Sequence, residues 1–285
     1  MSLTGPTITA NARRVQVTSD SNSEQAVLLT RFTSERRLVK RYRLGEDGAL
    51  VKEPGGAMDR GHAEMLQVQT MKAFAELLGD LEPNEAVTYG IHGEVGGQRY
   101  QVASREALEK GRVEEARTRT KEEMSYPSGP AVLFLDHDPE DGASPVQGTR
   151  LWEILCECFP KLEGHAAMLM PSSSSYLYNG AAQLHGLRGQ RIYLFVAEGT
   201  DIPRTMQALQ TVLWANGHGW IKLSRAGSKL ERTLFDSTTA QPNRFDFSRS
   251  VQTEAPIESR PPDPTLIPGT LLVNTREAFP SPGTL

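Results

Sequence analysis

Cysteine is scarce in this chain, and long apolar runs are absent from it. Its 285 residues include two cysteines, Cys156 and Cys158, in "LCEC". A C-x-C pair with no further cysteine or histidine cluster nearby is weak support for a metal site, so we interpret both as core residues. No apolar run approaches the roughly 18 residues of a membrane span, and "MSLTGPTITANARR" lacks the apolar centre of a signal peptide. We therefore expect a cytoplasmic protein from a reducing compartment, with no membrane partner.

A surplus of positive charge is also missing. The net charge is -4, so bulk electrostatics does not indicate a nucleic-acid-binding protein, and any such contact needs a local basic patch. Hydrophobic residues make up 38% of the chain. This content is enough for one large domain or two smaller ones, each with its own core.

The first part of the chain, residues 1–125, is predicted to form an N-terminal α/β module. Residues 26–44 are rich in strand-forming side chains, and the segment 60–81 carries apolar residues at helical spacing. The stretch 104–124 is charged and has few apolar anchors. It predicts a surface helix or a connection.

The second part, residues 126–255, alternates strand and helix patterns in the order β-α-β-β-α-β. This order is typical of the ferredoxin-like sheet, a split βαβ arrangement, and predicts an α+β fold. Asp201 is placed to cap the second helix, with Pro203 in its first turn and Gly217 at its end. The polar segment 171–189 predicts a long loop.

The last part, residues 256–285, is rich in proline. Proline at this density disfavours regular helices and central strands. The segment predicts either a tail that lies on the domain or a linker to something downstream, such as a helicase domain or partner.

The most strand-like stretch, "AVLFLDHDPEDG" at 131–142, ends in two aspartates. Asp136 and Asp138 share a face if the strand persists to its end. Adjacent carboxylates repel each other, and a buried carboxylate costs several kcal/mol unless it is paired. A cation between them would remove this conflict. A lone D-x-D after a strand is also common as a turn or a helix cap, and that alternative stays open.

Three further strand patterns carry polar residues near their ends. Lys222 and Ser224 share a face in "GWIKLS", Arg232 and Asp236 share one in "LERTLFD", and Arg191 begins "RIYLF". A sheet with three aspartates and these basic residues could hold a divalent cation and a polyphosphate together. Such a combination serves phosphoryl transfer assisted by two metals. Taken singly, each residue could equally belong to a solvated edge or a turn.

The motifs "LFLDHDP", "GQRIYLF" and "LERTLFD…QPNRFDF" resemble motifs I, II and III of the archaeo-eukaryotic primase superfamily. "MPSSSSYLY", "DIPRTMQAL" and "GHGWIKLSRAGSKLERTLFD" resemble, more narrowly, the primase-polymerase domains of plasmid and phage replication proteins. The resemblance is strongest over 117–250. It implies an RRM-like catalytic palm beside the N-terminal module. It also implies an Mg²⁺- or Mn²⁺-dependent nucleotidyltransferase that makes or extends primers on single-stranded DNA from NTPs or dNTPs.

The resemblance also implies roles for individual residues. Asp136, Asp138 and Asp236 match the catalytic metal ligands. Arg191 stands where the second motif usually ends in histidine, and an arginine there can hold a triphosphate through paired N–H groups. The full set of expected nucleotide-binding residues is Ser172, Ser173, Arg191, Lys222, Ser224 and Arg232.

The template-binding candidate is the basic segment "RRLVKRYR", residues 36–43, in which Arg37, Arg41 and Arg43 alternate onto one face. A solvated edge strand protected by its charge is an equally good interpretation. The alternative function is a catalytically weak module that binds single-stranded nucleic acid through the same sheet. A relaxase-type nuclease is disfavoured, because "DHD" supplies one histidine where such an enzyme needs an H-x-H pair.

Overall fold

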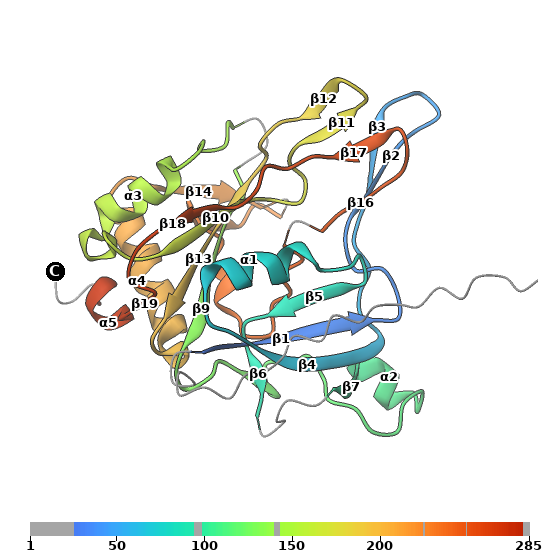
Figure 1. Ribbon diagram of the computed structural model, residues 1–285, viewed down its shortest axis with the longest axis horizontal. Coiled ribbons are helices and arrows are strands. Elements are labelled where there is room, and N and C mark those ends of the chain that lie inside the picture. Colours follow the sequence, from blue (N-terminus) through green and yellow to red (C-terminus); the bar gives the residue numbers. More distant parts are fainter. Residues whose placement is uncertain (1–25, 94–98, 140–142, 225, 249, 282–285) are drawn as a thin grey trace, which may run out of the picture.

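The computed structural model describes residues 26–93, 99–139, 143–224, 226–248 and 250–281 (Figure 1). They form a mixed α+β fold in which most paired strands are antiparallel and the helices are few. The first 25 residues of the predicted N-terminal module lie outside this description. No helix within the described part is long and apolar enough to cross a membrane.

A four-stranded antiparallel sheet forms the N-terminal part. Its order is β5-β1-β4-β7, and its strands are β5 (Glu85–Thr88), β1 (Val27–Ser34), β4 (Arg60–Val68) and β7 (Tyr100–Ala103). Helix α1 (Met71–Gly79) follows β4, and the Thr70 hydroxyl accepts a hydrogen bond from the Ala73 amide at 3.0 Å as its N-cap. The helical spacing predicted in 60–81 therefore holds for its second half only, since the first half pairs with β1 as strand β4.

A second sheet carries most of the predicted site. Strand β13 pairs antiparallel with β9 on one side and with β10 on the other. The connecting helices α3 and α4 lie where the sequence predicts them. The bounds are β9 (Ala131–His137), α3 (Arg150–Cys158), β10 (Ala167–Pro171), β13 (Gln190–Val196) and α4 (Ile202–Ala215).

The far side of β9 is extended by the chain that follows α4. This chain first forms the hairpin of β14 (Gly219–Leu223) and β15 (Lys229–Thr233). The Asp236 amide then donates a hydrogen bond to the Asp136 carbonyl oxygen at 2.9 Å. The third predicted aspartate is thereby brought beside the end of β9.

One apolar core joins the two sheets. Phe74 of α1 contacts the rings of Tyr193 and Phe195 on β13 at 5.4 and 5.6 Å between centroids, and that of Tyr89 at 6.1 Å. All four side chains are buried. Because edge-on aromatic contacts of this kind add to the apolar burial, α1 fixes the N-terminal sheet against the face of β13 that carries Arg191.

The two remaining hairpins lie close together in Figure 1, with β17 between them. One is β2 (Arg41–Leu44) with β3 (Leu50–Glu53), and the other is β11 (Leu177–Asn179) with β12 (Ala182–His185). The segment predicted as a long loop thus contains a hairpin. Small elements elsewhere are α2 (Arg105–Glu109), β6 (Ile91–His92), β8 (Met124–Ser125) and the 3-10 turns η2 (Pro160–Leu162), η3 (Gly199–Asp201) and η4 (Ser237–Ala240).

The proline-rich segment lies on the domain and adds short strands to two sheets. β16 (Gln252–Thr253), just before it, pairs with β2, and β17 (Ile257–Ser259) pairs with β11. β18 (Thr265–Ile267) covers the outer edge of β10, and β19 (Leu272–Val273) runs parallel to the end of β13 before helix α5 (Thr275–Ala278). Of the two sequence-based alternatives, the described part of the segment matches the tail packed on the domain.

Candidate active site

Strand β9 ends between the two aspartates of the first motif. Asp136 is its half-buried penultimate residue, whereas Asp138 lies one residue beyond the strand and is exposed. The His137 side chain between them is buried, and its Nδ1 lies 2.8 Å from the Leu234 carbonyl oxygen. Asp136 and Asp138 are expected to share a strand face only if the strand continues to Asp138. Strand β9 ends at His137, so this condition is not met.

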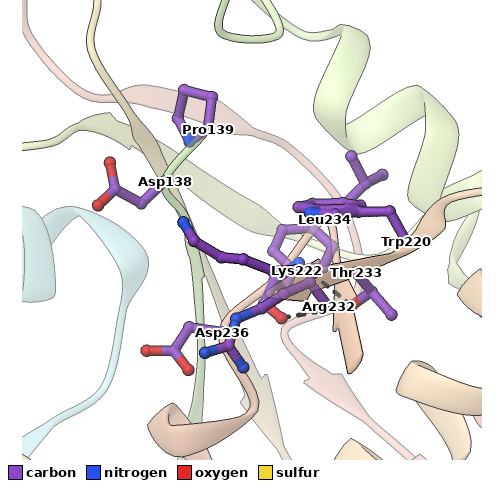
Figure 2. A pocket seen from close by; sticks show the side chains of 9 residues that line it. Asp138, Pro139, Trp220, Lys222, Arg232, Thr233, Leu234 and Asp236 are labelled. Atoms are coloured by element: carbon purple, nitrogen blue, oxygen red, sulfur yellow. Dashed lines mark hydrogen bonds between the residues drawn. The ribbon is translucent and has the colours of Figure 1, made fainter. Parts of the chain in front are cut away.

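A cavity of about 310 Å³ nevertheless brings four of the predicted residues together (Figure 2). Asp138 and Asp236 line it on one side, and Lys222 and Arg232 reach it from the β14–β15 hairpin. Figure 2 shows both carboxylates pointing to the same side, with the Lys222 side chain extending toward Asp138. Acidic and basic groups thus border one solvent-accessible space.

Strand pairing explains why the hairpin presents these side chains to the cavity. Trp220 lies directly opposite Arg232, and Lys222 lies two residues further along the same strand. Side chains two apart on a strand, and those of directly opposed residues, point to one face. Ser224 follows the end of β14 and does not line the cavity, because its hydroxyl accepts a hydrogen bond from the Ser228 amide at 3.0 Å within the turn.

Asp236 has a structural role as well as a place in the cavity wall. Its carboxylate accepts hydrogen bonds from the Thr238 amide at 3.0 Å and the Thr238 hydroxyl at 2.7 Å, and so caps η4. Arg244 lies 3.7 Å from the same carboxylate. The interpretation of Asp236 as a turn residue is therefore confirmed. The same capping contacts hold its carboxylate at the cavity wall, where it can also bind a metal ion.

Arg191 faces Asp136 directly across the ladder between β13 and β9. Its Nε donates to Asp136 Oδ1 at 3.3 Å, and its Nη1 lies 3.0 Å from Oδ1 of Asp246, a residue that the sequence analysis did not single out. Asp246 is buried and also accepts hydrogen bonds from the hydroxyls of Tyr89 at 2.5 Å and Tyr193 at 2.8 Å. The guanidinium is thus held between two carboxylates beneath the site.

The carboxylates around Arg191 favour its charged form. Burial alone would lower the pKa of Arg191, but the charges of Asp246 and Asp136 raise it above its usual range. Burial and the Asp246 charge raise the pKa values of Tyr89 and Tyr193, so both phenols stay neutral donors. To grip a triphosphate, Arg191 would have to leave both carboxylates, so its placement favours a positioning role.

The carboxylates suit a hard divalent cation that completes its shell elsewhere. Burial raises the pKa of Asp136, Arg191 opposes this rise, and the charges of Asp246 and Asp138 add to it. A cation close by would therefore lower the free energy of the ionised form. Within the described residues, no three acidic, histidine or cysteine side chains form a ready-made metal cage. The fit is to Mg²⁺ or Mn²⁺ held by one or two carboxylates, with water and substrate phosphates supplying the other ligands.

The two predicted serines lie at the end of β10. The Ser172 amide donates to the Gly189 carbonyl at 2.8 Å, and its hydroxyl lies 3.1 Å from that of Ser175. Ser173 is buried. Neither lines the cavity around Asp138 and Asp236, and the Ser172 hydroxyl contacts those of Ser174 and Ser175 within the serine-rich turn.

The three predicted template-binding arginines do lie together, but they share an acidic partner. Arg43 Nε lies 2.9 Å from Glu53, Arg41 lies 3.6 Å from it, and Arg37 lies 3.8 Å from it. Arg41 also forms an ion pair with Glu254. These carboxylates partly neutralise the basic face, so its attraction for phosphate is weaker than the sequence indicates.

A second cavity borders Asp138 from the other side and contains residues that the sequence analysis missed. It measures about 340 Å³, and its basic lining residues are Lys40, Lys52, His185 and Arg188. The alternation in "VKRYR" separates Lys40 from the arginines. Nothing in the sequence, however, indicates that the β2–β3 hairpin lies beside the end of β12.

Comparison with protein-family models, with curated proteins and with solved structures finds no match to this chain. The geometry of the site therefore carries the functional argument.

Proposed function

We propose that the chain is a metal-dependent DNA primase-polymerase that makes or extends primers on a single-stranded template. The observation that carries the proposal is the cavity in which Asp138 and Asp236 meet Lys222 and Arg232. Nucleotidyl transfer requires carboxylates that bind a metal ion, next to basic side chains that bind phosphate. These residues come from segments almost a hundred positions apart, so their convergence is independent support for the motif resemblance.

The arrangement of the second sheet supports an RRM-like palm. Across the sheet, the order is β10-β13-β9, followed by the segment around Asp236. Along the chain, the order is β9-α3-β10-β13-α4, followed by the same segment. A split βαβ sheet combines these two orders. The carboxylates lie at one end of its two central strands.

In the proposed reaction, the 3′ oxygen of the primer bonds to the α-phosphorus of the nucleotide. The bond from that phosphorus to the bridging oxygen breaks, pyrophosphate leaves and the hydroxyl proton passes to water. Asp138 and Asp236 are the residues that would hold a divalent cation, which would supply Lewis-acid activation of the hydroxyl and charge neutralisation at the phosphates. Lys222 and Arg232 bind phosphate oxygens, and the Trp220 ring offers a surface for a base.

One observation favours the second candidate, a catalytically weak module that binds single-stranded nucleic acid. Asp136 already accepts a hydrogen bond from Arg191, and an arginine cannot give up its proton near neutral pH. If Asp136 is required as a metal ligand, its pairing with Arg191 weakens the metal site. The cavity would then bind nucleic acid or nucleotide without efficient turnover.

The test is a primer-synthesis and primer-extension assay on single-stranded DNA. Mg²⁺ and Mn²⁺ are compared in separate reactions with rNTPs and dNTPs, and binding of the template is measured in parallel. We expect labelled products that require both template and metal. Template binding without product in any combination would favour the binding module and contradict the polymerase.

A further inference from the structure

The second cavity is lined by the segment after β9 and, on its basic side, by two hairpins that are far apart in the sequence. Lys40, Tyr42 and Lys52 line it from the β2–β3 hairpin, and His185 and Arg188 line it from the end of the β11–β12 hairpin. Asp138 belongs to the walls of both cavities. The space is therefore a basic compartment that meets the proposed catalytic carboxylates at a shared wall.

Strand geometry separates the charges of β2 and β3 onto two faces. Tyr42 lies directly opposite Lys52, so both point to the face that also carries Lys40. Arg41 lies opposite Glu53 on the other face and pairs with it. The arginines are thus neutralised on one side, and the lysines are directed into the cavity.

Positive charge dominates this cavity, and Asp138 is the acidic residue among the described residues that line it. Within the described part of the chain, none of Lys40, Lys52 and Arg188 forms an ion pair, in contrast to the arginines that share Glu53. Burial lowers the pKa of Lys40, and the charges of Lys52 and Arg191 lower it further, against a smaller opposing effect of Asp138. A bound anion would relieve this repulsion.

A buried hydroxyl points to the same kind of ligand. Tyr42 is 1% exposed and lines the cavity, and its hydroxyl lies near Ser174 without a hydrogen bond of normal geometry to any described residue. Buried hydroxyls are seldom left without a partner in folded proteins. A phosphate oxygen in the cavity would accept from this hydroxyl.

We infer that this cavity binds the triphosphate of the incoming nucleotide, through Lys40, Lys52 and Arg188. The inference rests on the proposed function and assigns the triphosphate to residues other than Arg191. A triphosphate carries several negative charges in a short length, which suits three cations around one small space better than a DNA backbone does. Its α-phosphate end then lies toward Asp138, at the wall that joins the two cavities.

The test is the binding of inorganic tripolyphosphate to the full chain, measured by isothermal titration calorimetry without metal or template. Arg188 is exposed, so Arg188→Gln avoids a folding defect, and Lys52→Gln and Lys40→Met keep the aliphatic stems. We expect each substitution to weaken binding by about tenfold or more, as for one charge-assisted contact. Lys161→Gln, an exposed lysine on η2, serves as the matched control and should bind as the wild type does.

Two further measurements separate this inference from the proposed function. The KM for nucleotide in primer extension should rise in the same variants, while affinity for a single-stranded oligonucleotide stays within about twofold of the wild type. If all three variants synthesise primers with unchanged tripolyphosphate binding and unchanged KM, the inference about this cavity is wrong, but the proposed function stands. Loss of oligonucleotide affinity in place of tripolyphosphate affinity would overturn it as well, and would assign the cavity to the template. If the chain binds tripolyphosphate through these residues but synthesises no primers, the triphosphate-binding inference is supported and the proposed polymerase function is contradicted.

Discussion

At the scale of single residues, the site contains aspartates in different environments. Asp138 is exposed at the wall between two cavities, and Asp236 is fixed by its cap on η4. Asp136 is half-buried against Arg191, and Asp246 is fully buried beneath it. Asp138 and Asp236 line the cavity and are available to a cation and substrate, whereas Asp136 and Asp246 hold Arg191 in place.

Arg191 should therefore matter for stability before it matters for nucleotide binding. Arg191→Met leaves Asp246 buried without its cation, and breaking a buried pair in this way costs about 3–5 kcal/mol. We expect the free energy of unfolding in urea to fall by that amount. Arg188→Met, at an exposed arginine three residues earlier, should change it by less than about 0.5 kcal/mol. Equal urea midpoints for Arg191→Met and the wild type would show that the network does not hold the fold.

A second residue-scale prediction concerns Asp201, whose carboxylate ties three elements together. It accepts two hydrogen bonds from Arg204, at 2.6 and 2.8 Å, and one from the Thr275 hydroxyl at 2.6 Å. The Arg204 contacts, with Thr275 and Thr205, lower the pKa of Asp201 to about 2, against the opposing effect of burial.

A lowered pKa means that Asp201 stabilises the fold while it is ionised. Its contribution is complete above the ordinary pKa of 3.8 and is lost as the pH falls toward about 2. Asp201→Asn should therefore lower the free energy of unfolding by about 2 kcal/mol at pH 7. The gap from the wild type should close below about pH 2.5, as measured by urea unfolding across the pH range. A gap that stays constant with pH would contradict the assignment.

At the scale of elements, the β2–β3 hairpin carries two basic surfaces with different partners. The arginine face is neutralised by Glu53, and the lysine face borders the second cavity. This division gives the hairpin two separable contributions to binding.

Removing the shared acid should expose the arginine face. Glu53→Gln is expected to strengthen binding to single-stranded DNA and to steepen its salt dependence by up to about 0.7 in the log–log slope per additional phosphate contact. Fluorescence anisotropy at several salt concentrations measures both quantities. Charge reversal at Arg37, Arg41 and Arg43 together should have the opposite effect. Unchanged affinity in both variants would identify this face as a charged edge without a role in template binding.

Local patterns predicted the elements that depend on neighbouring residues, and missed contacts that depend on distant ones. Helix α4 lies where Pro203 and Gly217 bound it, and Asp201 occupies its N-cap position, although the Asp201 side chain makes no capping hydrogen bond and pairs with Arg204 instead. The β11–β12 hairpin turns at Gly180 and Ala181, with Gly180 at positive φ, a local turn that the polar composition of the segment obscured.

The burial of Arg191 could not be predicted in the same way. Its second partner, Asp246, comes from an irregular segment after η4 that pairs with Val87 of the N-terminal sheet. Lys52 likewise reaches the second cavity only because two hairpins from different parts of the chain lie side by side. Pairings over such separations leave no periodic trace in one sequence.

At the scale of the whole molecule, the tail and the N-terminal sheet both close onto the second sheet. Phe279 is fully buried after α5, and its ring lies 4.8 Å from that of Phe159. Thr275 binds Asp201, and β18 covers the edge of β10. Residues 256–281 therefore belong to the fold.

Truncation after residue 255 tests this integration. Loss of the Phe279 side chain alone, as Phe279→Ala, should cost about 3–5 kcal/mol. The truncated chain also loses the cover of the β10 edge and the Thr275 contact, so we expect no cooperative thermal unfolding transition and a tendency to aggregate. A truncated chain with the wild-type melting temperature would mean that the segment is a linker.

The central claim is that Asp138 and Asp236 together form the catalytic centre of a nucleotidyltransferase. The most direct test is single-nucleotide incorporation on a primed template by Asp138→Asn and Asp236→Asn, with Asp80→Asn at an exposed position after α1 as the control. Removing a residue that hydrogen-bonds to a metal ligand typically costs about 10–100-fold in activity, so loss of a direct ligand should cost at least about a hundredfold. We expect that loss for both variants, with template affinity and melting temperature close to the wild type and with full activity in the control. Incorporation at the wild-type rate by either variant would contradict the central claim.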